Sequence, residues 1–288
     1  MPQFLVLLSL SIVFWVRPVV ATFALALKND EYTHILLILP VSAALILLEW
    51  KSLSVPSTAG LRTGSGLLSL AVLAECFSRW GLGNLSPDCH LSLDMAALVI
   101  WWLGSFIICY GTRVASQLLF PLVFLFWLVP LPGIALDRLV TLLQHQSADA
   151  THFLFSATGV PAIQNGMFIS IPGVTVEVAR ECSSIRSSLM LLVTSMVLAH
   201  LFLRAFWRQT LVVLAAIPLS VAKNAVRIFT LSMLGVHVDP GFLHGTLHER
   251  GGIVFFILAL VIVLLLLWVL GRSETKTSHH AALLPDRL

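Results

Sequence analysis

The sequence predicts an all-α polytopic membrane protein with about eight transmembrane helices, a small extracytoplasmic hairpin and an interfacial helix. Of its 288 residues, 58% are hydrophobic and only 11% are charged, and the mean hydropathy is +0.96. A soluble domain carries about 25% charged residues. The net charge of +3 is small and dispersed, with no basic stripe, which excludes a nucleic-acid-binding protein.

Long apolar runs define the expected spans, since a membrane helix needs about 20 apolar residues. The third run is short and contains Glu75. The chain begins Met-Pro-Gln without Lys or Arg, so the first run is interpreted as a retained helix and not as a cleaved signal peptide. The predicted spans are residues 4–27, 33–49, 65–79, 94–110, 115–130, 183–203, 208–235 and 252–270.

The stretch between the fifth and sixth spans differs from the rest of the chain. Residues 134–157 mix leucines with charged and amide side chains, which is typical of an interfacial or re-entrant helix. Asn165-Gly166 and Pro172-Gly173 are turn signals around β-branched residues, and they predict a small hairpin. The hairpin leads the chain to Cys182.

The distribution of basic residues predicts that both chain ends are cytoplasmic, because Lys and Arg concentrate in cytoplasmic loops. The hairpin, Cys182 and the loop 237–251 then lie on the outer side. We expect one membrane domain over residues 1–271 and a flexible cytoplasmic tail over 272–288. The residues assigned to the cytoplasm are Lys51, Arg62, Arg113, Arg204, Arg208, Arg272, Lys276 and Arg287; the opposite loops hold Lys28, Arg79, Arg138, Arg180 and Arg250.

Three of the four cysteines have simple interpretations. Cys109 lies in an apolar run and is expected to pack as a small hydrophobic residue. Cys76 and Cys89 flank a short loop and could form a disulfide if that loop is extracytoplasmic. The cysteine spacing fits no zinc site, and no metal or other cofactor is expected.

Cys182 is distinguished by its neighbours. A thiol in the first turn of a helix is near the positive end of the helix dipole, which favours the thiolate. Arg186 is four residues further on, on the same face, and adds positive charge. Alternatively, Cys182 only fills space at a capped helix start.

Asn224 and Arg227 lie within an otherwise apolar span and share one helix face. A charge inside a membrane helix is costly unless it faces a cavity or a partner, so it indicates a functional site. Alternatively, Arg227 extends outward to the interface or pairs with Glu177 or Glu181.

His244 and His248 precede the last span. Histidine exchanges protons in the range that a nucleophilic enzyme needs. The two could also bind zinc or be solvated loop residues, but Glu249 follows the second histidine, which is not the HExxH arrangement. A thiol, an arginine and a histidine on one membrane face supply the groups for acyl transfer.

The chain resembles the exosortase/archaeosortase family of membrane transpeptidases over nearly its whole length. The motifs that carry the resemblance occur in the family's order. They are Asp30-Glu31-Tyr32-Thr33-His34 with Glu49-Trp50-Lys51; Phe120-Pro121-Leu122 to Val129-Pro130-Leu131-Pro132; Asn165-Gly166 to Val178-Ala179 with Glu181-Cys182-Ser183-Ser184-Ile185-Arg186-Ser187; Ile217-Pro218 with Asn224-Ala225-Val226-Arg227; and His248 with Gly252 and Phe256.

The resemblance implies an eight-helix enzyme of the bacterial inner membrane that faces the periplasm. Such an enzyme cleaves the C-terminal sorting tail of exported precursors, typically a Pro-Glu-Pro-like signal, a transmembrane helix and a basic cluster. It then transfers them to an acceptor, such as an exopolysaccharide or a lipid. Cys182 corresponds to the nucleophile, and Arg227 and His248 complete the triad. Arg186, Asn224 and His244 are expected to support the site, and His248 is preferred over His244 because Gly252 and Phe256 follow it in the family register.

Two other functions compete with this hypothesis. A transporter would use Arg227 and the histidines to line a substrate path. A metal-dependent intramembrane protease would use His244 and His248 as ligands. Neither explains a cysteine at a helix start beside a turn-rich hairpin.

Overall fold

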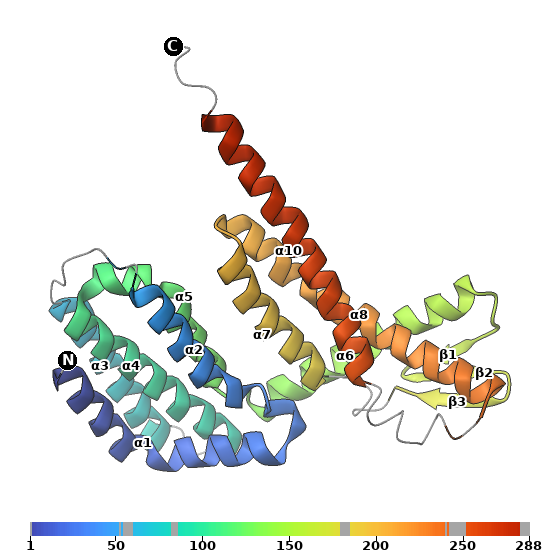
Figure 1. Cartoon of the computed structure of the whole chain (residues 1–288). Coiled ribbons are helices and arrows are strands. Elements are labelled where there is room, and N and C mark those ends of the chain that lie inside the picture. The colour runs from blue at the N-terminus through green and yellow to red at the C-terminus, as the bar shows by residue number, and fades with distance from the viewer. Residues whose placement is uncertain are drawn as a thin grey trace. The chain divides into compact units, whose positions relative to one another are not determined.

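The computed structural model describes residues 2–51, 53, 60–81, 86–178, 185–239, 241 and 252–282, with side chains up to residue 274 in the last segment. The chain divides into two compact units, Met1–Leu136 and Asp137–Leu288 (Figure 1). The prediction of a single domain over residues 1–271 stays a prediction.

The first unit is a helical bundle. Its helices are α1 (Pro2–Lys28), η1 (Asp30–Tyr32), α2 (Ile35–Trp50), α3 (Leu61–Cys76), the π-helical turn η2 (Phe77–Gly81), α4 (Pro87–Gln117), α5 (Leu119–Phe124) and η3 (Leu125–Leu128). The backbone of α4 is interrupted at Gly111, which has a φ of 84° and a ψ of 162°. The interruption falls between the predicted spans 94–110 and 115–130. The second of these is built from the end of α4, α5 and η3.

The carboxylate of Glu75 on α3 has two partners in the first unit. Glu75 accepts a hydrogen bond of 2.8 Å from the indole nitrogen of Trp15 and forms an ion pair of 2.6 Å with Arg79. These contacts compensate the carboxylate that made the third predicted span doubtful as a membrane helix. Cys76 and Cys89 are free thiols, so the disulfide considered for them is not formed.

The second unit combines helices with a small sheet. Its elements are α6 (Gly133–Ala157), β1 (Ile163–Asn165), β2 (Phe168–Ile171), β3 (Val174–Glu177), α7 (Ile185–Phe202), α8 (Phe206–His237) and α10 (Gly252–Ala282). The unit begins at Asp137, so the first four residues of α6 belong to the first unit. The predicted helix over 134–157 is confirmed by α6. Its position at a membrane interface stays a prediction.

The predicted hairpin is wrong in one respect, because the segment forms a three-stranded antiparallel sheet in the order β1-β2-β3. Gly166 and Gly173 both have a positive φ, 62° and 92°, which glycine adopts without steric cost. Both turn signals therefore reverse the chain, and two reversals make three strands.

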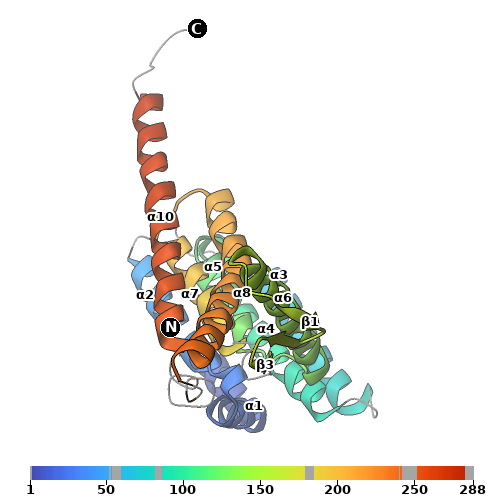
Figure 2. The same cartoon turned by 90° about the vertical axis from the view of Figure 1, so that its right-hand side faces the viewer.

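Two hydrophobic clusters hold the second unit together. The first joins α7, α8 and α10, and the second joins α6, the sheet and the C-terminal part of α8 (Figures 1 and 2). Since α8 has 32 residues, it is about 48 Å long and exceeds the roughly 30 Å of a bilayer core. The buried members are Leu191, Ala199, Leu203, Val212, Ala259, Val263 and Leu267 in the first cluster, and Ala148, Phe155, Ile169, Ile171, Val178 and Ile228 in the second.

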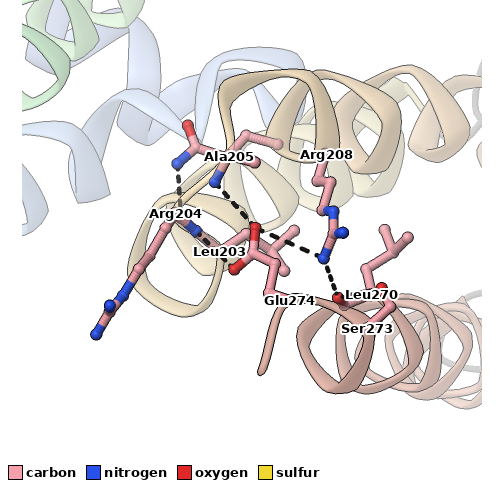
Figure 3. Close-up of polar contacts among 8 residues, drawn as sticks. Leu203, Arg204, Ala205, Arg208, Leu270, Ser273 and Glu274 are labelled. Carbon is pink, nitrogen blue, oxygen red and sulfur yellow. Dashed lines mark hydrogen bonds and ion pairs between the residues drawn. The ribbon is translucent and has the colours of Figure 1, made fainter. Parts of the chain in front are cut away.

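The far ends of α7, α8 and α10 are joined by a polar contact (Figure 3). Glu274 accepts hydrogen bonds from the backbone N–H groups of Arg204 and Ala205, at 3.1 and 2.9 Å. Arg208 donates a hydrogen bond of 2.7 Å to the carbonyl of Leu270. The last helix is thereby tied to the turn between α7 and α8.

Within the described residues, six helices are long and apolar enough to cross a membrane, and a bent pair, Leu119–Leu128 with Gly133–Ala157, could add a seventh. The polytopic helical fold is confirmed, but the count of about eight spans is not. The predicted third span forms α3, which has 16 residues and is not among these six helices. At the other end of the chain, α10 continues as a helix to Ala282, beyond residue 271. The flexibility of the tail stays a prediction.

Candidate active site

The structure describes three of the six residues proposed for the site. Asn224 and Arg227 lie on α8, and Arg186 lies in the first turn of α7. Cys182, His244 and His248 lie outside the described residues.

Arg227 is half-buried and lies beside the N-terminus of α10. A Cβ atom added to Gly252 would be 3.6 Å from a terminal guanidinium nitrogen of Arg227. The first residue of α10 therefore packs against the Arg227 side chain. In this sequence, His248 is four residues before Gly252.

Asn224 is almost completely buried, with 1% of its surface exposed. Its amide nitrogen donates a hydrogen bond of 3.0 Å to the hydroxyl of Ser147 on α6. This contact gives Asn224 a structural role, since a buried amide without a partner would be costly. It also joins α6 to α8 one turn before Arg227.

Lys223 lies on α8 next to Asn224 and one turn before Arg227, and no role was predicted for it from the sequence. It is buried, and its ammonium group donates a hydrogen bond to the hydroxyl of Ser187 in the first turn of α7. The signal was present in the sequence, because Lys223 and Arg227 are four residues apart and share a helix face.

Gln144 on α6 is the second residue that the sequence analysis missed. Its amide nitrogen donates a buried hydrogen bond of 2.9 Å to the carbonyl of Val178. The backbone N–H of Val178 donates to the carbonyl of Met167, at 2.8 Å. Both backbone groups of Val178, the residue after the sheet, are thus satisfied. The spacing of Gln144 and Ser147 places both on one face of α6.

Arg186 differs from the other two described site residues because it is exposed. The described part of its helix, α7, begins at Ile185 within the predicted span 183–203. The expectation that Cys182 lies in the first turn of this helix falls on residues outside the described part of the chain. Among the described residues, no group of three or more His, Cys, Asp or Glu side chains could hold a metal ion.

These features define a class of protein, a polytopic helical membrane protein with a buried lysine and a half-buried arginine on α8, near the starts of α7 and α10. The model of the transmembrane exosortase family (Exosortase_EpsH) matches residues 5–265, and the chain belongs to this family. No match is found among curated proteins or among solved structures. Family membership assigns the chain to membrane transpeptidases that act on sorting signals.

Proposed function

We propose that this protein cleaves the C-terminal sorting tail of membrane-anchored precursors, of the Pro-Glu-Pro-like type, through a thioester on Cys182. The precursor is then transferred to an acceptor outside the cytoplasm, an exopolysaccharide or a lipid, or is released by water. The triad consists of Cys182, Arg227 and His248. The protein works in the bacterial inner membrane with this site facing the periplasm.

The observation that carries the proposal is the position of Arg227 close to the starts of two helices, α7 and α10. Gly252, at the start of α10, packs against its guanidinium. Lys223, one turn away on α8, holds the first turn of α7 through Ser187. Both segments that carry the other two triad residues are therefore attached close to Arg227.

Chain length limits how far those residues can be from these attachment points. An extended chain spans at most about 3.6 Å per residue. Cys182 is three residues before Ile185, which restricts it to about 11 Å from that residue. His248 is four residues before Gly252, which restricts it to about 14 Å. These limits are compatible with a triad around Arg227.

In the proposed reaction, the Cys182 thiolate attacks the scissile carbonyl and forms a carbon–sulfur bond. The carbon–nitrogen bond to the sorting tail breaks, and His248 supplies a proton to the leaving amine. An acceptor nucleophile or water then attacks the thioester, gives its proton to His248 and releases the Cys182 sulfur. Arg227 stabilises the oxyanion formed in both steps.

The direct test is processing of a precursor with the predicted tail in cells that produce Cys182→Ala. We expect loss of cleavage, together with loss of a thioester adduct detected by mass spectrometry in the unsubstituted protein. Normal cleavage by Cys182→Ala would overturn the assignment of the nucleophile.

Separate His244→Ala and His248→Ala variants test the histidine assignment. We expect His248→Ala to lose cleavage and His244→Ala to retain most of it. If both variants cleave normally, histidine has no part in the mechanism. Cleavage that requires both histidines and is abolished by a chelator would instead support the metal-dependent protease.

A further inference from the structure

We infer that Lys223 is a positioning residue in a polar seam that holds both ends of the segment 179–184. The polar seam consists of Gln144 and Ser147 on α6, Ser187 on α7, and Lys223 and Asn224 on α8. The inference rests on the proposed function, because it gives the seam the task of setting Cys182 against Arg227.

One end of the segment is held by α6. The amide of Gln144 donates a hydrogen bond of 2.9 Å to the carbonyl of Val178, the residue directly before the segment. Gln144 is buried, with 9% of its surface exposed, so water does not compete for this bond. Val178 itself is completely buried in the cluster beneath the sheet. The chain is therefore anchored where the segment begins.

The other end is held by α8. The segment is followed by Ile185, which is buried at 4% exposure, and then by Ser187, the partner of Lys223. Lys223 is 7% exposed, and within the described part of the chain no carboxylate pairs with it. The ammonium group is therefore directed at the first turn of α7.

The two anchors are connected to each other. Ser147, one turn from Gln144 on α6, accepts a hydrogen bond of 3.0 Å from Asn224, the neighbour of Lys223 on α8. Ser147 and Asn224 are each 1% exposed. A movement of α8 relative to α6 would break this hydrogen bond between two buried groups, which is costly, so the seam keeps both anchors in one geometry.

Lys223 is an unfavourable residue for packing alone. A charge within a membrane span is costly, and Arg227 adds a second cation four residues away on the same helix. A leucine would avoid both costs. A hydrogen bond that holds the first turn of the helix following Cys182 in the sequence explains why a cation is present at this position.

The test uses purified protein and kinetics of precursor cleavage. Ser187→Ala and Lys223→Met should lower kcat by about 100-fold, because a displacement of about 1 Å is sufficient for such a loss, and should leave KM within a few-fold. Ser187→Thr keeps the hydroxyl group and should recover much of kcat. The matched control is Ser195→Ala on α7, where a buried serine hydroxyl has no hydrogen-bond partner in the described structure; it should cleave normally.

A second readout does not depend on turnover. In a protein with Cys76, Cys89 and Cys109 replaced by alanine, we expect Ser187→Ala to change the rate of maleimide modification of Cys182. Ser187→Thr and Ser195→Ala should not change it. The Tm of each variant is measured in detergent, and only variants with the Tm of the unsubstituted protein are compared. This separates an effect on positioning from an effect of unfolding.

The outcomes separate this inference from the proposed function. If Cys182→Ala is inactive while Ser187→Ala and Lys223→Met retain normal kcat, the polar seam has no positioning role. Equal losses in Ser187→Ala and Ser195→Ala would also overturn it. Cleavage that survives Cys182→Ala but requires Ser187 would make serine the nucleophile and overturn both proposals.

Discussion

Arg227 is a cation inside a membrane helix, and its environment determines what it can do. Arg227 is half-buried, and its guanidinium group lies beside Gly252 at the start of α10. A planar guanidinium can donate several hydrogen bonds in fixed directions, whereas a lysine ammonium cannot reproduce this geometry. These properties suit a residue that stabilises an oxyanion.

We therefore expect Arg227→Lys to retain the charge but to lower kcat for precursor cleavage by about 100-fold, as for other oxyanion donors. Arg113→Lys, at an exposed position in the first unit, is the matched control and should have no effect. If Arg227→Lys cleaves as fast as the wild type, a positive charge is sufficient at this position and the directed hydrogen bonds of a guanidinium are not required.

Gly252 provides a second prediction for single residues. A Cβ at this position would be 3.6 Å from the Arg227 guanidinium, an ordinary van der Waals distance. Gly252→Ala should therefore cleave almost normally, whereas the longer side chain of Gly252→Leu should displace Arg227 and reduce cleavage. Gly271→Leu on the same helix, where a Cβ would have no neighbour within 4 Å, is the control. Equal activity of both leucine variants would contradict the packing of Gly252 against Arg227.

At the scale of elements, α3 and α4 approach each other closely at two glycines. A Cβ on Gly64 would be 2.4 Å from the Ile108 side chain and 2.9 Å from the backbone carbonyl of Gly104. Small residues allow such close contact between membrane helices. The packing of α3 on α4 therefore depends on the absence of a side chain at Gly64.

Gly64→Ala should destabilise the protein by about 1–3 kcal/mol, because backbone atoms would have to move. Gly66→Ala on the same helix should be neutral or slightly stabilising, because a Cβ there meets no atom within 4 Å and alanine favours helix. The measurement is the Tm of the purified protein in detergent. A lower Tm for Gly66→Ala than for Gly64→Ala would contradict this packing.

The contact of Glu274 joins three helices of the second unit (Figure 3). Its carboxylate accepts from two backbone N–H groups and is 3.8 Å from Arg208. Glu274→Leu should cost about 1 kcal/mol, the typical value for losing a helix cap. Glu274→Gln should cost less, because its amide oxygen still accepts one of the bonds. Thermal unfolding of both variants tests this prediction. If Glu274→Leu, Glu274→Gln and the wild type have the same Tm, the contact does not contribute to the stability of the unit.

At the scale of the whole molecule, the number of spans decides the orientation of the site. Six spans, as found by helix length and composition, and about eight, as predicted, are both even numbers. Either number leaves both chain ends on one side and the segments 131–184 and 237–251 on the other. The bent pair, counted as a seventh span, would place the two chain ends on opposite sides.

Cys89 distinguishes six spans from eight. With eight spans it lies outside the cytoplasm, and with six it lies in the cytoplasm. From the distribution of basic residues we expect the first arrangement, so an impermeant maleimide should label a single-Cys89 protein in spheroplasts. A single-Cys109 protein, with its thiol within α4, is the control and should need detergent. Protection of Cys89 until the membrane is permeabilised would favour six spans.

The sequence alone was sufficient for the membrane class, most of the helices and the presence of α7 within the predicted span 183–203. These features depend on local properties, namely hydropathy, helix periodicity and turn residues. Both turns were recognised in the sequence, but the segment was predicted as a two-stranded hairpin. Because each turn reverses the chain, two turns produce three strands. The interruption of α4 at Gly111 was not predicted as such; it lies between the predicted spans 94–110 and 115–130.

The polar seam was decided by the tertiary structure. Asn224 and Ser147 are 77 residues apart, Lys223 and Ser187 are 36 apart, and Gln144 and Val178 are 34 apart. Periodicity shows which face of a helix is polar, but it does not show which other helix that face meets. The sequence therefore determined that α8 carries cations on one face. Only the folded chain decided that one of them holds the start of α7 and another lies against the start of α10, because those contacts depend on how three helices pack.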